Sequence, residues 1–130
     1  MTQDQFDAQV DRFILHEIET VPHLEALLLI WNTRPQPWTA ESLSQRLYIS
    51  PNKVHELLDD LVRRFLIVLV PGKPSAYRYA ADSQDKDQLL AAVNETYRRE
   101  LVRVSTMIHS KPSAAVREFA QAFRITKERK

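Results

Sequence analysis

The chain has 130 residues, of which 44% are apolar, with one glycine, no cysteine and a formal net charge of +1. This length and apolar content suit one domain with extensions, and the absence of a run of about 18 apolar residues predicts no transmembrane helix. Without cysteine there is no disulfide framework and no thiolate metal site, and the acidic N-terminus argues against a signal peptide. We therefore expect a cytoplasmic protein without a membrane partner.

Charge is distributed unevenly along the chain. Residues 1–20 carry one arginine against five acids, residues 21–80 seven bases against five acids, and residues 81–130 ten bases against seven acids. We expect an N-terminal amphipathic helix over 1–20, a central domain over 21–80 and C-terminal helices over 81–130. The total charge gives only weak support for nucleic-acid binding, for which a clear basic excess is typical.

The first expected element is a helix over residues 4–19, because apolar residues recur there every three or four positions. Phe6 and Phe13 belong to this apolar stripe, and acidic residues occupy the opposite face. A helix this short is marginal alone and has to pack on another surface. That surface is either its own domain or a second subunit, and we favour the second subunit.

A second helix is expected over residues 22–33, and the Arg-Pro-Gln-Pro segment at 34–37 then breaks the chain. The next two helices are marked by N-cap residues, whose side-chain oxygens accept backbone N–H groups of the first turn. Thr39 caps one helix, and Ser50 caps the next, with Pro51 at its first position. Two helices separated by about three residues predict a helix-turn-helix motif.

The second helix of this motif has an apolar stripe that reaches Phe65 and a polar face of the kind that enters a major groove in DNA-reading proteins. Asn52 could bind adenine through two hydrogen bonds, and Lys53 or His55 could reach a guanine edge or a phosphate. These positions would also suit an ordinary solvated helix surface. Three acids within residues 56–60 favour that alternative, because carboxylates repel phosphates and leave the helix without net charge.

A β-hairpin is expected after this helix. Residues 66–70 form an aliphatic run and residues 76–80 alternate, and the turn between them holds the glycine. Lys73 and Arg78 lie where a wing touches the DNA backbone, although Arg78 would equally suit a hairpin that only covers the core. The order helix, turn, helix, hairpin is that of a winged helix.

In this order of elements, residues 22–80 resemble the winged helix-turn-helix domains of bacterial transcriptional regulators, broadly of the MarR, PadR and ArsR groups. The resemblance lies in the pattern and not in a diagnostic motif. It implies a mainly α fold with a small β-hairpin, DNA binding and regulation of transcription. The chain also resembles small proteobacterial winged-helix proteins that end in an F-A-D-A-F-R segment, which residues 119–124 match except at Gln121.

Beyond the hairpin, one continuous helix is expected over about residues 85–109, near 40 Å long at about 1.5 Å per residue. Its apolar stripe from Leu90 to Ile108 needs a partner surface, and pairing with a second copy of the chain provides one. Folding back onto its own domain is the alternative. A last short stripe includes Phe119 and Phe123, which could join the dimer interface or face another protein.

The sequence shows no catalytic constellation. A single glycine excludes a phosphate-binding loop and a dinucleotide fingerprint, and the four histidines lack the paired spacing of a metal site. No serine lies in a nucleophile-elbow context. We therefore expect no enzyme activity, no cofactor and no metal.

The leading hypothesis is a homodimeric winged-helix protein that binds double-stranded DNA and regulates transcription. The residues expected to contact DNA are Arg46, Ser50, Asn52, Lys53, His55, Arg63, Lys73 and Arg78. The residues expected at the dimer interface are Phe6, Phe13, Leu90, Val93, Tyr97, Leu101, Val104, Ile108, Phe119 and Phe123. The alternative is a protein-interaction module on a winged-helix scaffold that does not bind DNA, since one fold can host unrelated functions. A small-molecule effector is compatible with the first hypothesis, but no residue identifies one.

Overall fold

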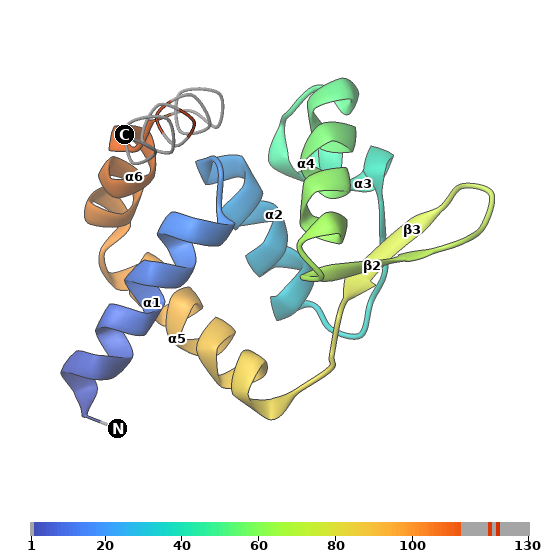
Figure 1. Ribbon diagram of the computed structural model, residues 1–130. Coiled ribbons are helices and arrows are strands. Elements are labelled where there is room, and N and C mark those ends of the chain that lie inside the picture. The colour runs from blue at the N-terminus through green and yellow to red at the C-terminus, as the bar shows by residue number, and fades with distance from the viewer. Residues whose placement is uncertain (1, 113–119, 121, 123–130) are drawn as a thin grey trace.

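The computed structural model describes residues 2–112, together with residues 120 and 122 (Figure 1). Its elements are, in chain order, α1 (Gln3–Glu17), α2 (Val21–Asn32), β1 (Trp38–Thr39), α3 (Ala40–Leu47), α4 (Pro51–Arg63), β2 (Ile67–Val70), β3 (Ala76–Tyr79), α5 (Gln84–Arg99) and α6 (Leu101–Ser110). The expected mainly helical fold with a small hairpin is confirmed. None of the described helices combines the length and apolar character that a membrane crossing requires.

Helix α2 lies between the two sides of the molecule (Figure 1). It contacts α3, α4 and β3 on one side, and α5 and α6 on the other. The consecutive residues Ala26, Leu27 and Leu28 are all buried, and so are Leu24 and Ile30. Because successive helical residues point about 100° apart, this burial covers more than one face of α2. The helix therefore joins both sides into one core.

The sheet contains a strand that the sequence analysis did not expect. Strand β1 pairs with β3, with Trp38 opposite Tyr77, and the strand order is β1-β3-β2 with antiparallel neighbours. A two-residue strand has no alternation that could be recognised in a sequence. Strands β2 and β3 form the expected hairpin, which extends beyond the helices (Figure 1).

Helix α1 packs on α5 and α6 of its own chain. Ile14 is fully buried, and Phe6 and Phe13 are half-buried against the same core. Arg103 of α6 also pairs with Asp11 of α1, with 3.1 Å between the nitrogen and the carboxylate oxygen. The preference for a second subunit as the packing surface of α1 is corrected, because α5 and α6 already cover its apolar stripe.

The prediction of one continuous helix over residues 85–109 is wrong. Helix α5 ends at Arg99, Glu100 leaves the helical conformation with φ −127° and ψ 48°, and α6 begins at Leu101. The Glu100 carboxylate accepts a hydrogen bond from Nε of Arg103 at 2.8 Å on the far side of the break. The break lets α6 take its own direction and lie against α1 and α2.

Four residues of the expected dimer stripe belong to the core of the single chain. They are at most 3% exposed and are Leu90, Val93, Val104 and Ile108. Since α1 and α2 supply an apolar surface within the chain, these side chains leave water without a second copy. The expectation of an exposed stripe at these positions is therefore corrected.

The other residues of that stripe differ in exposure. The Tyr97 hydroxyl donates to the Glu25 carboxylate of α2 at 3.0 Å, and burial together with Glu25 raises the pKa of Tyr97 to about 12, so the hydroxyl stays protonated. Leu101 is 52% exposed, and its neighbour Val102 is 77% exposed. Phe119 and Phe123, which were also expected at the dimer interface, lie outside the described residues.

Two valines of α6 provide a matched test of this core. Val104→Ala should lower the free energy of unfolding by about 2 kcal/mol, because it removes buried methyl groups and leaves a cavity. Val102→Ala makes the same chemical change at a position that is exposed in the single chain, and at protein concentrations too low for self-association it should alter stability by less than about 0.5 kcal/mol. Urea denaturation at several protein concentrations checks both values.

The loss in Val104→Ala should be the same at every protein concentration, since the contact lies within one chain. A loss that appears only at concentrations where the protein self-associates would place Val104 in an interface between copies and contradict the assignment to the core.

Candidate nucleic-acid interface

Side-chain caps fix the starts of both helices of the motif. The Thr39 hydroxyl accepts the N–H of Ser42 at 3.0 Å, and the Ser42 hydroxyl accepts the N–H of Thr39 at the same distance. The Ser50 hydroxyl accepts the N–H of Lys53 at 3.4 Å, and Pro51 is the first residue of α4. The two N-caps expected from the sequence are confirmed, and they determine where α4 presents its first turn.

Helix α4 buries one face and exposes the other. The buried residues are Val54, Leu57, Leu58 and Leu61, none more than 3% exposed. Asn52, Lys53 and His55 are exposed and lie at the start of the helix. These three side chains could enter a groove of DNA without any rearrangement of the core.

Asp60 is turned away from the exposed face of α4. Its carboxylate lies 3.2 Å from Nε2 of His23 in α2 and 3.4 Å from Nε of Arg64, and its side chain is 17% exposed. Of the three acids in residues 56–60, Glu56 and Asp59 are exposed. One of the three carboxylates that argued against DNA binding is therefore paired with Arg64 and partly buried.

His23 contacts this partly buried carboxylate. Burial lowers the pKa of His23 from its ordinary value of 6.5, outweighing Asp60 and Glu19, which raise it. The Nδ1 atom lies 2.6 Å from the Thr20 hydroxyl. A neutral ring accounts for both contacts, because Nδ1 then accepts from Thr20 and Nε2–H donates to Asp60.

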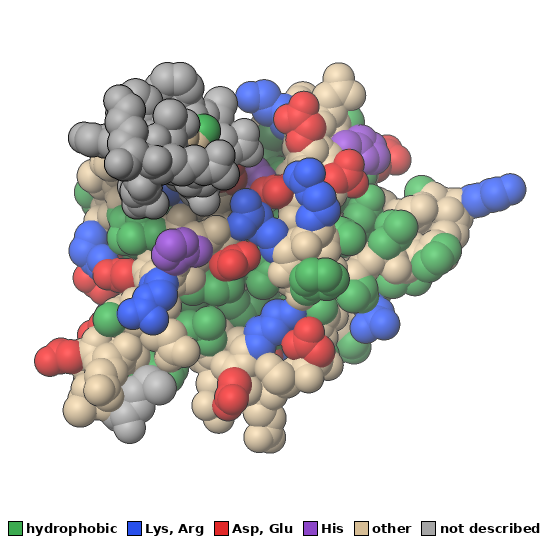
Figure 2. Space-filling view, viewed as in Figure 1, with side chains coloured by type: hydrophobic (Ala, Val, Ile, Leu, Met, Phe, Trp, Pro, Cys, Tyr) green, Lys and Arg blue, Asp and Glu red, His purple; other side chains and the backbone are tan. Residues whose placement is uncertain are grey.

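The hairpin presents two basic side chains. Lys73 lies in the turn and Arg78 in β3, and both are exposed. Tyr77 and Tyr79 flank Arg78 and are buried, because alternate residues of a strand point to opposite faces. Figure 2 shows a basic side chain at the tip of the hairpin and side chains of both signs along α4.

The expected DNA contacts do not form a single cluster. The four that share the start of α4 are Ser50, Asn52, Lys53 and His55. Arg63 lies at the other end of the helix and pairs with Asp60 at 3.0 Å. Arg46 lines a hollow of about 280 Å³ between α2, α3 and α5, together with Arg98. These positions separate Arg63 and Arg46 from the first turn of α4.

A groove of about 550 Å³ lies between α4 and the hairpin. Its walls combine the acids Glu56 and Asp59 and the base Arg63 with apolar side chains, of which Leu69 is 49% exposed. Figure 2 shows hydrophobic side chains along the hairpin and beside α4. This mixture of apolar side chains with charges of both signs suits a protein segment better than a phosphate backbone.

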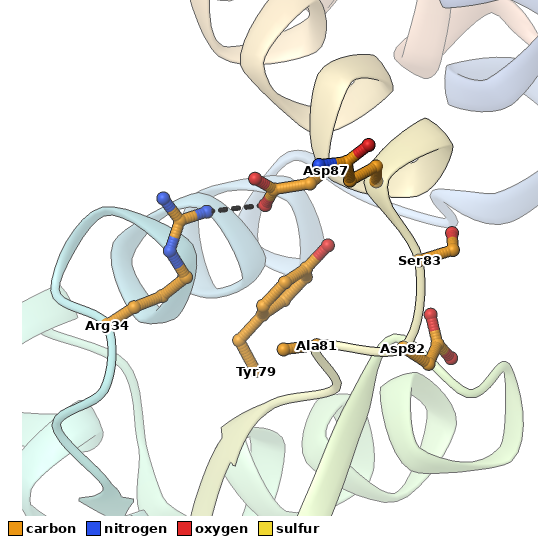
Figure 3. Close-up of a pocket in the computed structure, with 7 residues that line it drawn as sticks. Arg34, Tyr79, Ala81, Asp82, Ser83 and Asp87 are labelled. Atoms are coloured by element: carbon orange, nitrogen blue, oxygen red, sulfur yellow. Dashed lines mark hydrogen bonds and ion pairs between the residues drawn. The ribbon is translucent and has the colours of Figure 1, made fainter.

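A second cavity, of about 450 Å³, lies where the chain passes from β3 to α5 (Figure 3). Arg34 donates to the Asp87 carboxylate at 2.7 Å, and Nε1–H of Trp31 donates to the same carboxylate at 2.9 Å. Burial and then Asp87 raise the pKa of Tyr79, whose ring forms part of the cavity wall, to about 12. These contacts fasten the end of α2 to the start of α5. Within the described residues, no group of histidine, aspartate and glutamate could hold a metal ion.

Two exposed aromatic residues were missed by the sequence analysis. Tyr48 ends α3 in the left-handed conformation with φ 57° and is 94% exposed. Phe65 follows α4 with φ 61° and is 76% exposed, so its expected place in the apolar stripe of that helix is wrong. One signal could have found them. Helices often end in a residue with a left-handed backbone, usually glycine, but the single glycine of the chain lies in the hairpin turn. A left-handed end of α3 or α4 therefore has to use a residue with a side chain.

Comparison with known proteins supports the fold. No protein-family model and no curated protein matches the chain. The adhesin competence repressor AdcR from Streptococcus pyogenes superposes with a TM-score of 0.52 at 16% identity, over 99% of this chain and 96% of AdcR. The heme sensor protein PefR from Streptococcus agalactiae, in complex with heme, superposes with a TM-score of 0.52 at 15% identity, over 97% of this chain and 86% of PefR. A MepR mutant from S. aureus superposes with a TM-score of 0.53 at 17% identity, over 96% of this chain and 88% of MepR.

At these identities the similarity concerns the fold alone. The chain has a winged-helix fold that it shares with these three proteins, and the expected resemblance is confirmed at that level.

The partial burial of His23 predicts a pH dependence of stability, because burial lowers the pKa of its ring. Since the folded state lowers the pKa of His23, the unfolded chain binds a proton more readily below about pH 6.5. The free energy of unfolding should therefore fall between about pH 7.5 and pH 5.5, and the fall should be smaller in His23→Gln. Urea denaturation of both proteins at the two pH values measures the difference. An identical fall in both would show that His23 is not held neutral by the fold.

Proposed function

We propose that this protein binds double-stranded DNA and regulates transcription, with α4 in the major groove and the hairpin on the backbone. The observation that carries the proposal is the first turn of α4, which is capped by Ser50 and presents Asn52, Lys53 and His55 to solvent. Residues at the start of the second helix are those that reach base edges in helix-turn-helix proteins. The fold shared with AdcR, a repressor, agrees with this proposal.

Each exposed residue has a distinct part in the proposed complex. Asn52 pairs with adenine through its amide, and Lys53 or His55 reaches guanine or a phosphate. Lys73 and Arg78 of the hairpin contact phosphates, which gives affinity and orientation rather than choice of sequence. The position of Asp60 supports this arrangement, because its carboxylate lies against His23 and Arg64 and not among the exposed residues at the start of α4.

We further propose that the protein acts as a homodimer. Two copies of α4 would then read one face of the duplex at a separation of about 34 Å, or a multiple of it. The adjacent residues Leu101 and Val102 support this part, since they are 52% and 77% exposed at the start of α6. Burying two such apolar side chains against a second copy is favourable.

The alternative is a protein-interaction module that does not bind DNA. The groove between α4 and the hairpin favours it, because Leu69 lies there beside the acids Glu56 and Asp59. Salt separates the two functions: binding through phosphates weakens steeply as salt rises, whereas an apolar protein interface does not.

DNA binding can be measured by fluorescence anisotropy with duplexes from the region upstream of the coding sequence, between about 50 and 200 mM salt. The wild-type protein should bind, and its affinity should fall as salt rises. Lys53→Ala should reduce the slope of log affinity against log salt by about 1 if Lys53 contacts a phosphate. Asn52→Ala should lose about 1–3 kcal/mol of discrimination between sites and leave the slope unchanged.

Arg99→Ala is the matched control, since it removes an exposed positive charge from α5, outside the helix-turn-helix and hairpin. Its affinity and salt slope should equal those of the wild type. No binding at low salt by a folded protein would favour the interaction module instead.

The proposed dimer predicts a species of twice the 15.2 kDa chain mass in sedimentation velocity. Val102→Glu should shift the protein toward monomer, because it places a charge in the proposed apolar contact. Leu69→Glu makes a similar change on the hairpin and should leave the mass unchanged. A wild-type protein that is monomeric at every concentration would contradict the proposed dimer.

A further inference from the structure

Tyr48 occupies an unusual position in the turn between α3 and α4. Its backbone is left-handed, with φ 57° and ψ 44°, and its side chain is 94% exposed. A side chain with a Cβ is disfavoured in this conformation, which glycine or asparagine adopts more readily. A strained, solvent-exposed aromatic residue gains nothing from the core, and such strain is typical of functional positions.

The turn holds Tyr48 firmly in this position. Ser44 of α3 makes two hydrogen bonds to the backbone of Ile49, the residue after Tyr48. The Ser44 carbonyl accepts the N–H of Ile49 at 3.2 Å, and the Ser44 hydroxyl donates to the carbonyl of Ile49 at 2.5 Å. The Ile49 side chain is half-buried against the core. With its neighbour clamped, Tyr48 projects from a fixed backbone, and little conformational freedom of the turn is lost when a partner binds.

The charges around Tyr48 in the sequence indicate the class of partner. No acidic residue occurs between Glu41 and Glu56, whereas Arg46 and Lys53 lie within this stretch. Tyr48 also lies two residues before Ser50, at the end of α4 that presents its first turn to solvent. A polyanion that approaches the start of α4 therefore meets the exposed Lys53, the Tyr48 phenol and the N-terminus of a helix, which favours negative charge.

We propose that Tyr48 contacts the DNA backbone beside the major groove, with its hydroxyl donating to a phosphate oxygen and its ring lying against the sugar. This inference rests on the proposed DNA binding and adds a contact that carries no charge. The contact positions α4 without reading a base, since it involves phosphate and sugar only.

Phe65 provides a matched control within the same chain. It is also an exposed aromatic residue with a positive φ. Its side chain is 76% exposed and its φ is 61°, but it lies beyond the opposite end of α4. In both Tyr48→Gly and Phe65→Gly, glycine relieves the left-handed backbone. The midpoint of urea unfolding should therefore be unchanged or higher in both variants, so a loss of binding cannot arise from unfolding.

Anisotropy titrations of the full-length protein with the duplex that the wild type binds test the contact. Tyr48→Gly should weaken binding by about tenfold, which is typical of losing a hydrogen bond to a charged group, and Phe65→Gly should bind like the wild type. Tyr48→Phe should lose most of the same affinity. The slope of log affinity against log salt should not change in either Tyr48 variant, because no charge is removed.

The outcomes separate this inference from the function on which it rests. Salt-sensitive wild-type binding with unchanged affinity in Tyr48→Gly would overturn the Tyr48 contact and leave DNA binding standing. Full affinity in Tyr48→Phe, with a loss in Tyr48→Gly, would overturn the hydrogen bond to phosphate. A wild-type protein without DNA binding would overturn both. A loss in Phe65→Gly equal to that in Tyr48→Gly would overturn the assignment of the contact to the start of α4.

Discussion

The burial of α2 on more than one face is the constraint on which the rest of the structure depends. A helix with apolar residues on one stripe needs one partner, whereas α2, with buried residues 26–28 in succession, needs neighbours on several sides. Helices α3 and α4 with the hairpin cover one side, and α5 and α6 cover the other. The expected DNA-reading helix and the helices α5 and α6 therefore share one core, which α2 joins.

The break at Glu100 follows from the same constraint. A straight helix from 85 to 109 would present one long stripe to a partner outside the chain, but the core inside the chain offers α1 and α2. By breaking, the chain buries Val104 and Ile108 internally and leaves Leu101 and Val102 in solvent. Of the stripe from Leu90 to Ile108, the apolar surface that remains for another molecule is thus smaller than the sequence indicates, and it lies at the start of α6.

Ion pairs arrange the charges of a chain whose net charge is +1. Asp60 lies partly buried against His23 and Arg64, and Asp87 binds Arg34 at a partly exposed position. These pairs join α4 to α2, and α5 to the segment after α2, so they contribute to the arrangement of the fold as well as to its charge. Formal charge counted along the chain misses this, because it treats a paired carboxylate and a free one as equal.

The sequence by itself determined the local elements: the Thr39 and Ser50 caps, the helix-turn-helix, the hairpin and hence the winged-helix fold. Caps, proline positions and apolar periodicity act over three or four residues, so they can be recognised without the rest of the chain. Tertiary structure alone decided the break at Glu100, the burial of Leu90 and Val93, the pairing of Asp60 and the exposure of Tyr48. Each of these depends on which distant surface a side chain meets, since periodicity shows that a stripe must be covered but not what covers it.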